Sequence, residues 1–137
     1  MPRLCSVLLA VAAVLLAACT STRIESVHFG ASGDVESAIL RYYERYASEG
    51  GCFRPIISGF TQITLLEDTA DRLVIHVRYL WRDRVQEGGG SGQVCRGFGE
   101  RTFTLARNPE GRPVVVGMSG QQDEAVVRSL IRRVLPN

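Results

Sequence analysis

The spacing of hydrophobic and polar residues after position 33 predicts one helix, four strands and a second helix. Between Asp34 and Glu49, apolar and aromatic residues recur every three or four positions, as on one side of an α-helix. Asp34 is a suitable N-cap, and Gly50-Gly51 follows as a stop signal. On the charged side, Arg45 and Glu49 are spaced as an i,i+4 pair. The apolar stripe consists of Val35, Ala38, Ile39, Tyr42, Tyr43, Tyr46 and Ala47.

Alternation replaces the helical spacing after Pro55 and predicts strands at 57–66 and 72–82, joined by a turn at 67–71. The second strand is the clearest in the chain, because one of its faces is entirely apolar or aromatic. That face carries Leu73, Ile75, Val77, Tyr79 and Trp81, and the mixed face carries Val74, His76, Arg78, Leu80 and Arg82. This pattern is typical of an antiparallel sheet that is covered on one side.

A long strand is predicted at 93–107. Phe98 and Phe103 are an odd number of residues apart, so they are expected on opposite faces of this strand unless its register slips. Gly97 and Gly99 favour a β-bulge here, which would also bend the sheet.

Turn residues separate the last elements of the chain. The segment 87–92, EGGGSG, is predicted to be a hairpin loop, since it lacks the lysine and the following helix of a phosphate-binding loop. The turn 108–111, NPEG, leads into a strand at 112–118. One face of that strand is expected to carry Val114, Val116 and Met118. Ser119 and Gln122 then have the spacing of a capping box at the start of a C-terminal helix.

The C-terminal helix is expected to pack on the domain, and an amphipathic membrane helix is the alternative interpretation. Its apolar stripe consists of Val126, Val127, Leu130, Ile131 and Val134. The predicted fold class is therefore α+β, with one N-terminal helix packed on a curved four-stranded antiparallel sheet and followed by a C-terminal helix.

The composition is that of a globular protein, with 45% hydrophobic and 22% charged residues among 137. All 16 basic residues are arginines, set against 14 acidic residues. Because the arginines are scattered along the chain, the charge pattern argues against a nucleic-acid partner.

An apolar run at 7–18 follows a short start that contains one charge, Arg3. This arrangement is typical of a secretory signal peptide. The stretch at 4–18, about 15 residues, is short for a membrane-spanning helix, which needs about 20. The run closes on Leu16-Ala17-Ala18-Cys19, which resembles the lipobox of bacterial lipoproteins. The resemblance implies that Cys19 is the lipidated first residue of the mature chain. Thr20, in place of the aspartate that retains such proteins in the inner membrane, implies the periplasmic face of the outer membrane.

This resemblance divides the chain into a signal peptide at 1–18, a lipidated tether at 19–33 and a single domain at 34–137. The tether is rich in small and polar residues. Several acyl chains on Cys19 would make the membrane the first expected partner.

Two cysteines, Cys52 and Cys95, remain in the mature domain and are predicted to form a disulfide in an oxidising compartment. Closing a loop of this length is worth roughly 4 kcal/mol in the chain-entropy model. Free or redox-active thiols and a zinc site that also uses His76 are the alternatives. The spacing is neither CxxC nor that of a usual zinc motif.

The order of one helix and four strands resembles the cystatin-like and nuclear-transport-factor-like superfolds over about residues 34–118. Only one helix precedes the sheet here, whereas the nuclear-transport-factor pattern has several, and both superfolds host many functions. Residues 40–105 also look like a group of alphaproteobacterial lipoproteins without a settled activity. The matching runs are RYYERYASEGG, Cys52-Phe53-Arg54-Pro55, VRYLWRD and CRGFGERTFTL. This second resemblance implies fold and location only.

Two binding functions and one catalytic function are compatible with this pattern. The first is an interaction module of the cell envelope, with His76, Arg78 and Arg82 on the mixed strand face as candidate contacts for a protein partner; a solvated face is the alternative. The second is a small-ligand binder with a pocket between helix and sheet. Its candidate lining is Tyr43, Tyr46, Tyr79 and Trp81, which would otherwise be core residues.

Catalysis has the least support from the sequence. The only histidines are His28 and His76, and no spacing pairs either of them with a carboxylate for acid–base chemistry. A serine nucleophile elbow is also absent. We therefore expect a protein that is not an enzyme and that needs no metal or cofactor.

Overall fold

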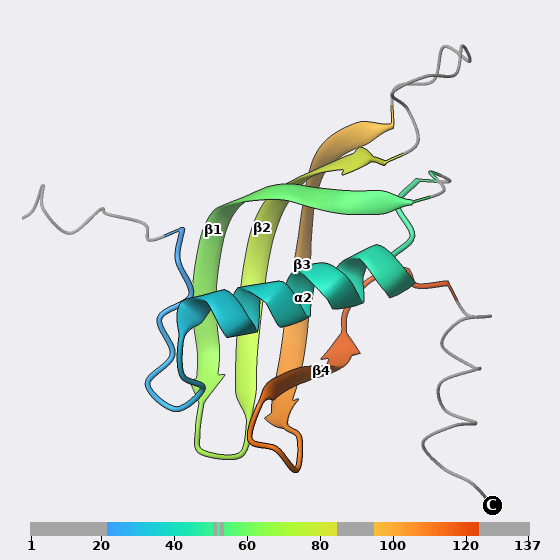
Figure 1. Ribbon diagram of the computed structural model, residues 1–137. Helices are drawn as coiled ribbons and strands as arrows, with labels where there is room; N and C mark the ends of the chain where they lie inside the picture. Colours follow the sequence, from blue (N-terminus) through green and yellow to red (C-terminus); the bar gives the residue numbers. More distant parts are fainter. Residues whose placement is uncertain (1–21, 51, 53, 85–94, 124–137) are drawn as a thin grey trace, which may run out of the picture.

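One helix and four strands are arranged in two layers in the computed structural model, which describes residues 22–50, 52, 54–84 and 95–123 (Figure 1). The elements are α2 (Ser32–Tyr46), β1 (Pro55–Asp68), β2 (Leu73–Asp83), β3 (Arg96–Arg107) and β4 (Pro113–Met118). The strands pair antiparallel in the order β1-β2-β3-β4, and α2 lies across one face of the sheet. The predicted α+β class with a four-stranded antiparallel sheet is confirmed.

The sheet is curved, and its edge strand β1 bends over α2 together with β2 and β3 (Figure 1). The pairing of β1 with β2 shifts register at three places, and β-bulges of this kind bend and twist a strand. The predicted bulge at Gly97 and Gly99 is wrong, because β2 and β3 pair without interruption from Leu73↔Leu105 to Arg82↔Arg96.

The two glycines of β3 instead make room for aromatic rings on the neighbouring strand. A Cβ atom at Gly99 would lie 2.6 Å from Cζ of Tyr79, and one at Gly97 would lie 3.2 Å from Nε1 of Trp81. Glycine in a strand often marks such a close approach. Both rings therefore lie flat over β3 where a larger residue would displace them.

The hydrophobic core lies between α2 and the inner face of the sheet. The inner face of β2 is the predicted one, and Phe103 is buried while Phe98 is 81% exposed, as their spacing predicts. The buried side chains of α2 are Val35, Ala38, Ile39, Tyr43 and Tyr46. Fully burying a large apolar side chain is worth about 1.5–3 kcal/mol, so this layer is the main source of stability.

The ends of the helix differ from the prediction. The N-cap is Ala31, and Asp34 lies in the first turn, where a carboxylate interacts favourably with the helix dipole. The helix ends at Tyr46, because Ala47 is already extended. Glu49 therefore lies beyond the helix and cannot form the predicted i,i+4 pair with Arg45.

Residues 24–29, which the prediction assigned to the tether, belong to the folded core. Ile24 and Phe29 are fully buried, and the guanidinium of Arg107 lies 4.8 Å from the centre of the Phe29 ring. The carboxylate of Asp68 accepts hydrogen bonds from Ser26 Oγ (3.0 Å) and Val27 N (2.8 Å). The packed domain therefore begins near residue 24.

The inner face of β4 also differs from the prediction. A register shift in its pairing with β3 places Val116 outside the ladder, where it is 59% exposed. Val115 and Met118 contact the core in consequence, whereas Val114 and Val116 do not belong to it. The bulge breaks the alternation on which the predicted face Val114, Val116 and Met118 depended.

The segment that follows β4 is extended, so a helix does not begin at Ser119. Ser119 Oγ accepts a hydrogen bond from Thr102 N (2.7 Å) rather than capping a helix. Gln122 forms an isolated antiparallel bridge with Ala47, beside the end of α2. The predicted apolar stripe of the C-terminal helix lies at 124–137, outside the described residues. Among the described helices, none has the length and apolarity needed to cross a bilayer.

We predict that Asp68→Asn destabilises the domain by about 1–2 kcal/mol at neutral pH, because it weakens hydrogen bonds to a charged acceptor. Partial burial would raise the pKa of Asp68, but hydrogen bonds from Val27, Ser26 and the His28 ring outweigh it and hold the pKa below its ordinary value of 3.8. The stabilising contribution is therefore present above pH 3.8 and is lost as the pH falls through the lowered pKa.

Urea unfolding between pH 2.5 and 7 measures this effect. The matched control is Asp71→Asn, an exposed carboxylate in the following turn. An equal loss of stability in both variants, or an acid dependence unchanged by Asp68→Asn, would contradict the assignment.

Candidate functional site

Tyr43 and Tyr79, two of the predicted pocket residues, meet between α2 and β2. Their rings pack edge to face with centroids 5.1 Å apart, and both side chains are fully buried. Tyr46 is buried against Tyr42, with ring centroids 4.5 Å apart, and Trp81 is half-buried over Gly97. The rings thus pack on protein atoms, and Tyr43 and Tyr79 leave no exposed surface for a ligand.

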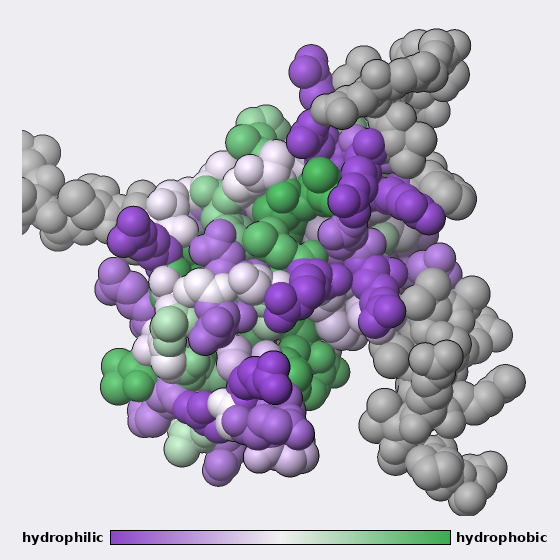
Figure 2. Space-filling model, viewed as in Figure 1, coloured by the Kyte–Doolittle hydropathy of each residue, from purple (hydrophilic) through white to green (hydrophobic). Residues whose placement is uncertain are grey.

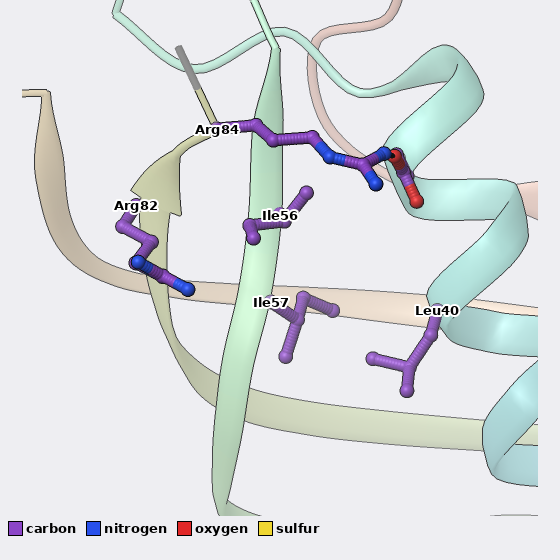
Figure 3. Close-up of a pocket in the computed structure, with 6 residues that line it drawn as sticks. Leu40, Ile56, Ile57, Arg82 and Arg84 are labelled. Carbon is purple, nitrogen blue, oxygen red and sulfur yellow. Dashed lines mark hydrogen bonds and ion pairs between the residues drawn. The ribbon is translucent and has the colours of Figure 1, made fainter. Parts of the chain in front are cut away.

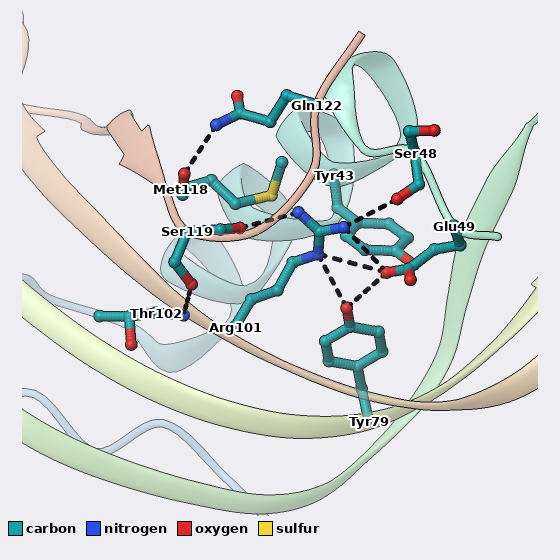
Figure 4. A network of polar contacts seen from close by, with 9 residues as sticks. All are labelled: Tyr43, Ser48, Glu49, Tyr79, Arg101, Thr102, Met118, Ser119 and Gln122. Atoms are coloured by element: carbon teal, nitrogen blue, oxygen red, sulfur yellow. Dashed lines mark hydrogen bonds and ion pairs between the residues drawn. The ribbon is translucent and has the colours of Figure 1, made fainter. Parts of the chain in front are cut away.

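The hydroxyls of these two tyrosines belong to a buried polar network centred on Arg101 (Figure 4). Tyr43 and Tyr79 each donate to Oε1 of Glu49, at 2.9 and 2.7 Å. Arg101 Nη2 donates to the same oxygen at 3.0 Å, and Arg101 Nε donates to the Tyr79 hydroxyl at 2.9 Å. The side chain of Arg101 is 4% exposed, so this is a buried ion pair with two hydroxyl groups bound to its carboxylate.

Arg101 also binds two backbone carbonyls, which ties four parts of the chain together. Nη2 donates to Ser48 O at 3.0 Å and Nη1 donates to Ser119 O at 2.7 Å. The guanidinium lies 5.5 Å from the centre of the Tyr43 ring, within range of a cation–π contact. One side chain of β3 therefore holds the exit of α2, the middle of β2 and the segment after β4.

The environment of the network fixes its protonation. Burial raises the pKa of Tyr79 to about 12, with the Glu49 carboxylate acting in the same direction and Arg101 opposing it. Burial also raises the pKa of Tyr43. Burial would lower the pKa of Arg101, but Tyr79 and Glu49 outweigh it and raise it. Both tyrosines therefore stay protonated donors, and the guanidinium stays charged.

Sequence reasoning did not identify Arg101 or Glu49. A signal for Arg101 was present, since it lies two residues before Phe103 and therefore on the same, inward face of the strand. An arginine at such a position requires a carboxylate partner. Nothing local in the sequence indicates which of the acidic residues that partner is.

The candidate partner residues His76, Arg78 and Arg82 lie on the outer face of β2, opposite the face that α2 covers. Arg78 Nε donates to Glu100 Oε2 at 3.2 Å, and His76 Nδ1 lies 3.2 Å from Thr102 Oγ1. These contacts are cross-strand pairs between β2 and β3. The structure therefore brings His76 and Arg78 into one exposed polar row.

A hydrophobic pair, Leu80 and Phe98, lies next to this polar row on the outer face. The two residues are directly paired across β2 and β3, between the pair Arg78↔Glu100 and the pair Arg82↔Arg96. Leu80 is 38% exposed, and Phe98 is the most exposed aromatic side chain among the described residues. We call these six residues the outer-face patch.

The predicted disulfide between Cys52 and Cys95 is confirmed, with an S–S distance of 2.03 Å. It joins the chain just after the Glu49 turn to the residue that precedes β3. Asp83 lies close to both sulfur atoms, but the bond between them leaves no thiolate to ligate a metal.

We predict that Arg101→Met destabilises the domain by about 3–5 kcal/mol, because it leaves the Glu49 carboxylate buried without its counter-charge. Arg78→Met is the matched control, since it makes the same replacement on the exposed face of the same sheet and breaks a surface pair worth under about 1 kcal/mol. Urea unfolding with the disulfide intact measures both. Equal unfolding midpoints for the two variants would contradict the central role of Arg101.

The structure places the predicted residues in two separate groups, the buried tyrosines and the outer-face patch, while Cys19 lies outside the described residues. Comparisons with protein-family models, with curated protein sequences and with solved structures find no match to this chain. Function is therefore inferred from the side chains that the fold brings together.

Proposed function

We propose that the chain is a lipid-anchored domain on the periplasmic side of the outer membrane, where it acts as an interaction module for an envelope protein. The observation that carries the proposal is the outer-face patch, in which an exposed aromatic side chain is flanked by arginines on the face of the sheet opposite α2. Catalysis and cofactor chemistry form no part of it.

The location is supported by two features far apart in the sequence. Residues 16–19 resemble a lipobox, and a disulfide such as Cys52–Cys95 persists in compartments outside the cytosol. The buried core begins at Ile24, five positions after Cys19. A fully extended linker of that length reaches at most about 17 Å, so the domain would stay close to the membrane surface.

The chemistry of the patch indicates the kind of partner. Aromatic residues and arginine are enriched at protein interfaces, and exposed apolar side chains that lie together within a polar rim mark interaction sites. Three arginines and one glutamate flank the Leu80–Phe98 pair, which leaves an excess of positive charge. We therefore infer a partner surface with an apolar pocket for Phe98 and carboxylates around it.

The alternative is a small-ligand pocket lined by the tyrosines between helix and sheet. It has less support, because Tyr43 and Tyr79 are fully buried and their hydroxyls are bound to Glu49. A ligand there would have to displace the network around Arg101.

We predict that Cys19→Ala moves the protein out of the membrane fraction, because the acyl chains have no other attachment point in the proposal. Intact-mass measurement of the natural product should show a chain that begins at Cys19 and carries diacylglyceryl and acyl additions. An unmodified Cys19, or membrane association that survives the substitution, would contradict the anchored location.

We predict that a photo-crosslinking amino acid at Phe98 captures one defined envelope protein in intact cells, and that the same probe at Leu80 captures the same protein. Val27 is the matched control position, since it is also a strongly exposed hydrophobic residue but lies outside the patch. Charge reversal by Arg78→Glu should reduce the yield at Phe98 several-fold. Equal capture from Val27, or yield that is insensitive to Arg78→Glu, would contradict the proposed interface.

A further inference from the structure

A groove opens between the C-terminal half of α2 and the start of β1. Its hollow of about 400 Å³ has an apolar floor made by Leu40, Ile56 and Ile57 (Figure 3). Glu44 and Arg84 meet across its rim as an ion pair. A hollow of this size is within the range that holds a small molecule.

Positive charge gathers at the end of the groove. An adjoining hollow shares Glu44 and is otherwise lined by Arg41, Arg45 and Arg54. With Arg84 from the first hollow, four arginines lie around one carboxylate, Glu44, among the described lining residues. Figure 2 shows hydrophobic side chains exposed between α2 and β1, with hydrophilic side chains gathered beside them.

We propose that this groove binds an anionic amphiphile, meaning a single molecule with a phosphate or carboxylate head and an aliphatic chain. The site is distinct from the protein–protein interface proposed above, because the arginines around the head group and the side chains of the apolar floor all lie outside the outer-face patch. Among the described lining residues, Arg82 alone also belongs to that patch. The head would lie among Arg41, Arg45 and Arg54, and the chain would lie on the floor of Leu40, Ile56 and Ile57.

The charge arrangement favours an anion over a cation or a neutral ligand. The one lining carboxylate, Glu44, is already paired with Arg84. Within the part of the chain that the structure describes, the side chains of Arg41 and Arg54 have no carboxylate partner. Guanidinium groups bind carboxylates and phosphates through two parallel hydrogen bonds, which suits several arginines arranged around one head group.

The shape favours a single molecule over a bilayer surface. Leu40 and Ile57 lie between α2 and β1 and point toward each other, whereas a membrane-binding surface would present its apolar side chains outward (Figure 3). Leu40, Ile56 and Ile57 are each half-buried, so an aliphatic ligand chain that packs on them loses contact with water on more than one side. The arginines favour an anionic head group and the apolar floor favours an aliphatic chain, and an anionic amphiphile has both.

Calorimetric titration of the full chain with dodecyl phosphate, kept below its critical micelle concentration, tests the proposal. Cys19→Ser is included so that no acyl chain of the protein competes for the groove. Arg54→Gln should weaken binding about tenfold, the loss of one charged hydrogen-bonding group. Glu44→Gln should strengthen it, because it frees Arg84 and removes the carboxylate that opposes an anion among the described lining residues. The control Arg112→Gln, an exposed arginine of the β3–β4 turn, should leave binding unchanged.

Two comparison ligands test the head group and the apolar floor separately. Inorganic phosphate should bind more weakly than dodecyl phosphate, and equal affinity would exclude a role for the apolar floor. Dodecyl maltoside, which has the aliphatic chain without the charged head, should also bind more weakly than dodecyl phosphate. Equal affinity would exclude a role for the arginines in binding. Dodecyl phosphate binding that is unchanged in both Arg54→Gln and Glu44→Gln would overturn the site.

Vesicles of phosphatidylglycerol separate a free amphiphile from a lipid head group within a bilayer. The single-molecule site predicts binding to dodecyl phosphate whether or not the protein sediments with vesicles. Sedimentation that is lost in Arg54→Gln, together with no binding to monomeric dodecyl phosphate, would overturn the proposal and identify the groove as a membrane-surface contact.

Discussion

The buried ion pair of Arg101 and Glu49 is the contact on which the arrangement of this domain depends. A guanidinium taken out of water must have its donors bound, and here Glu49, the Tyr79 hydroxyl and two backbone carbonyls accept from it. These acceptors belong to three parts of the chain, namely the turn after α2, the strand β2 and the segment after β4. The requirement therefore decides where α2 ends and where the segment after β4 runs. Buried ion pairs often add little net stability, so the effect of this one lies in selecting a single arrangement.

The sequence predicts well those features that follow from the spacing of side chains along one element. The helical stripe of α2, the inner face of β2 and the opposite placement of Phe98 and Phe103 are all confirmed. Each depends only on the periodicity of the element, because side chains three or four residues apart share one face of a helix and side chains two residues apart share one face of a strand. The outer-face arginines are placed by the same rule, which is why the candidate partner residues emerge as neighbours.

The features that sequence reasoning missed all depend on residues far away along the chain. Glu49 lies beyond the end of α2 and binds Arg101, which is 52 residues later. Residues 24–29 pack in the core because Asp68 binds them from more than 40 residues away. The glycines of β3 are explained by aromatic rings on β2, and the face of β4 is changed by one bulge. No local pattern contains this information, since a bulge inverts the alternation that the pattern assumes.

The framework around Arg101 also determines how well the groove beside α2 is formed. Arg45 lies at the end of the helix, and Arg54 lies two residues after Cys52, so both belong to the stretch that the ion pair and the disulfide hold in place. The backbone N–H of Arg84 donates a hydrogen bond to the carbonyl oxygen of Arg54, at an N···O distance of 3.0 Å. Arginine side chains are long and lose much rotational freedom when they bind. Because their backbone positions are already fixed, an anion that binds them has to order only the side chains, and the unfavourable entropy of binding is smaller for that reason.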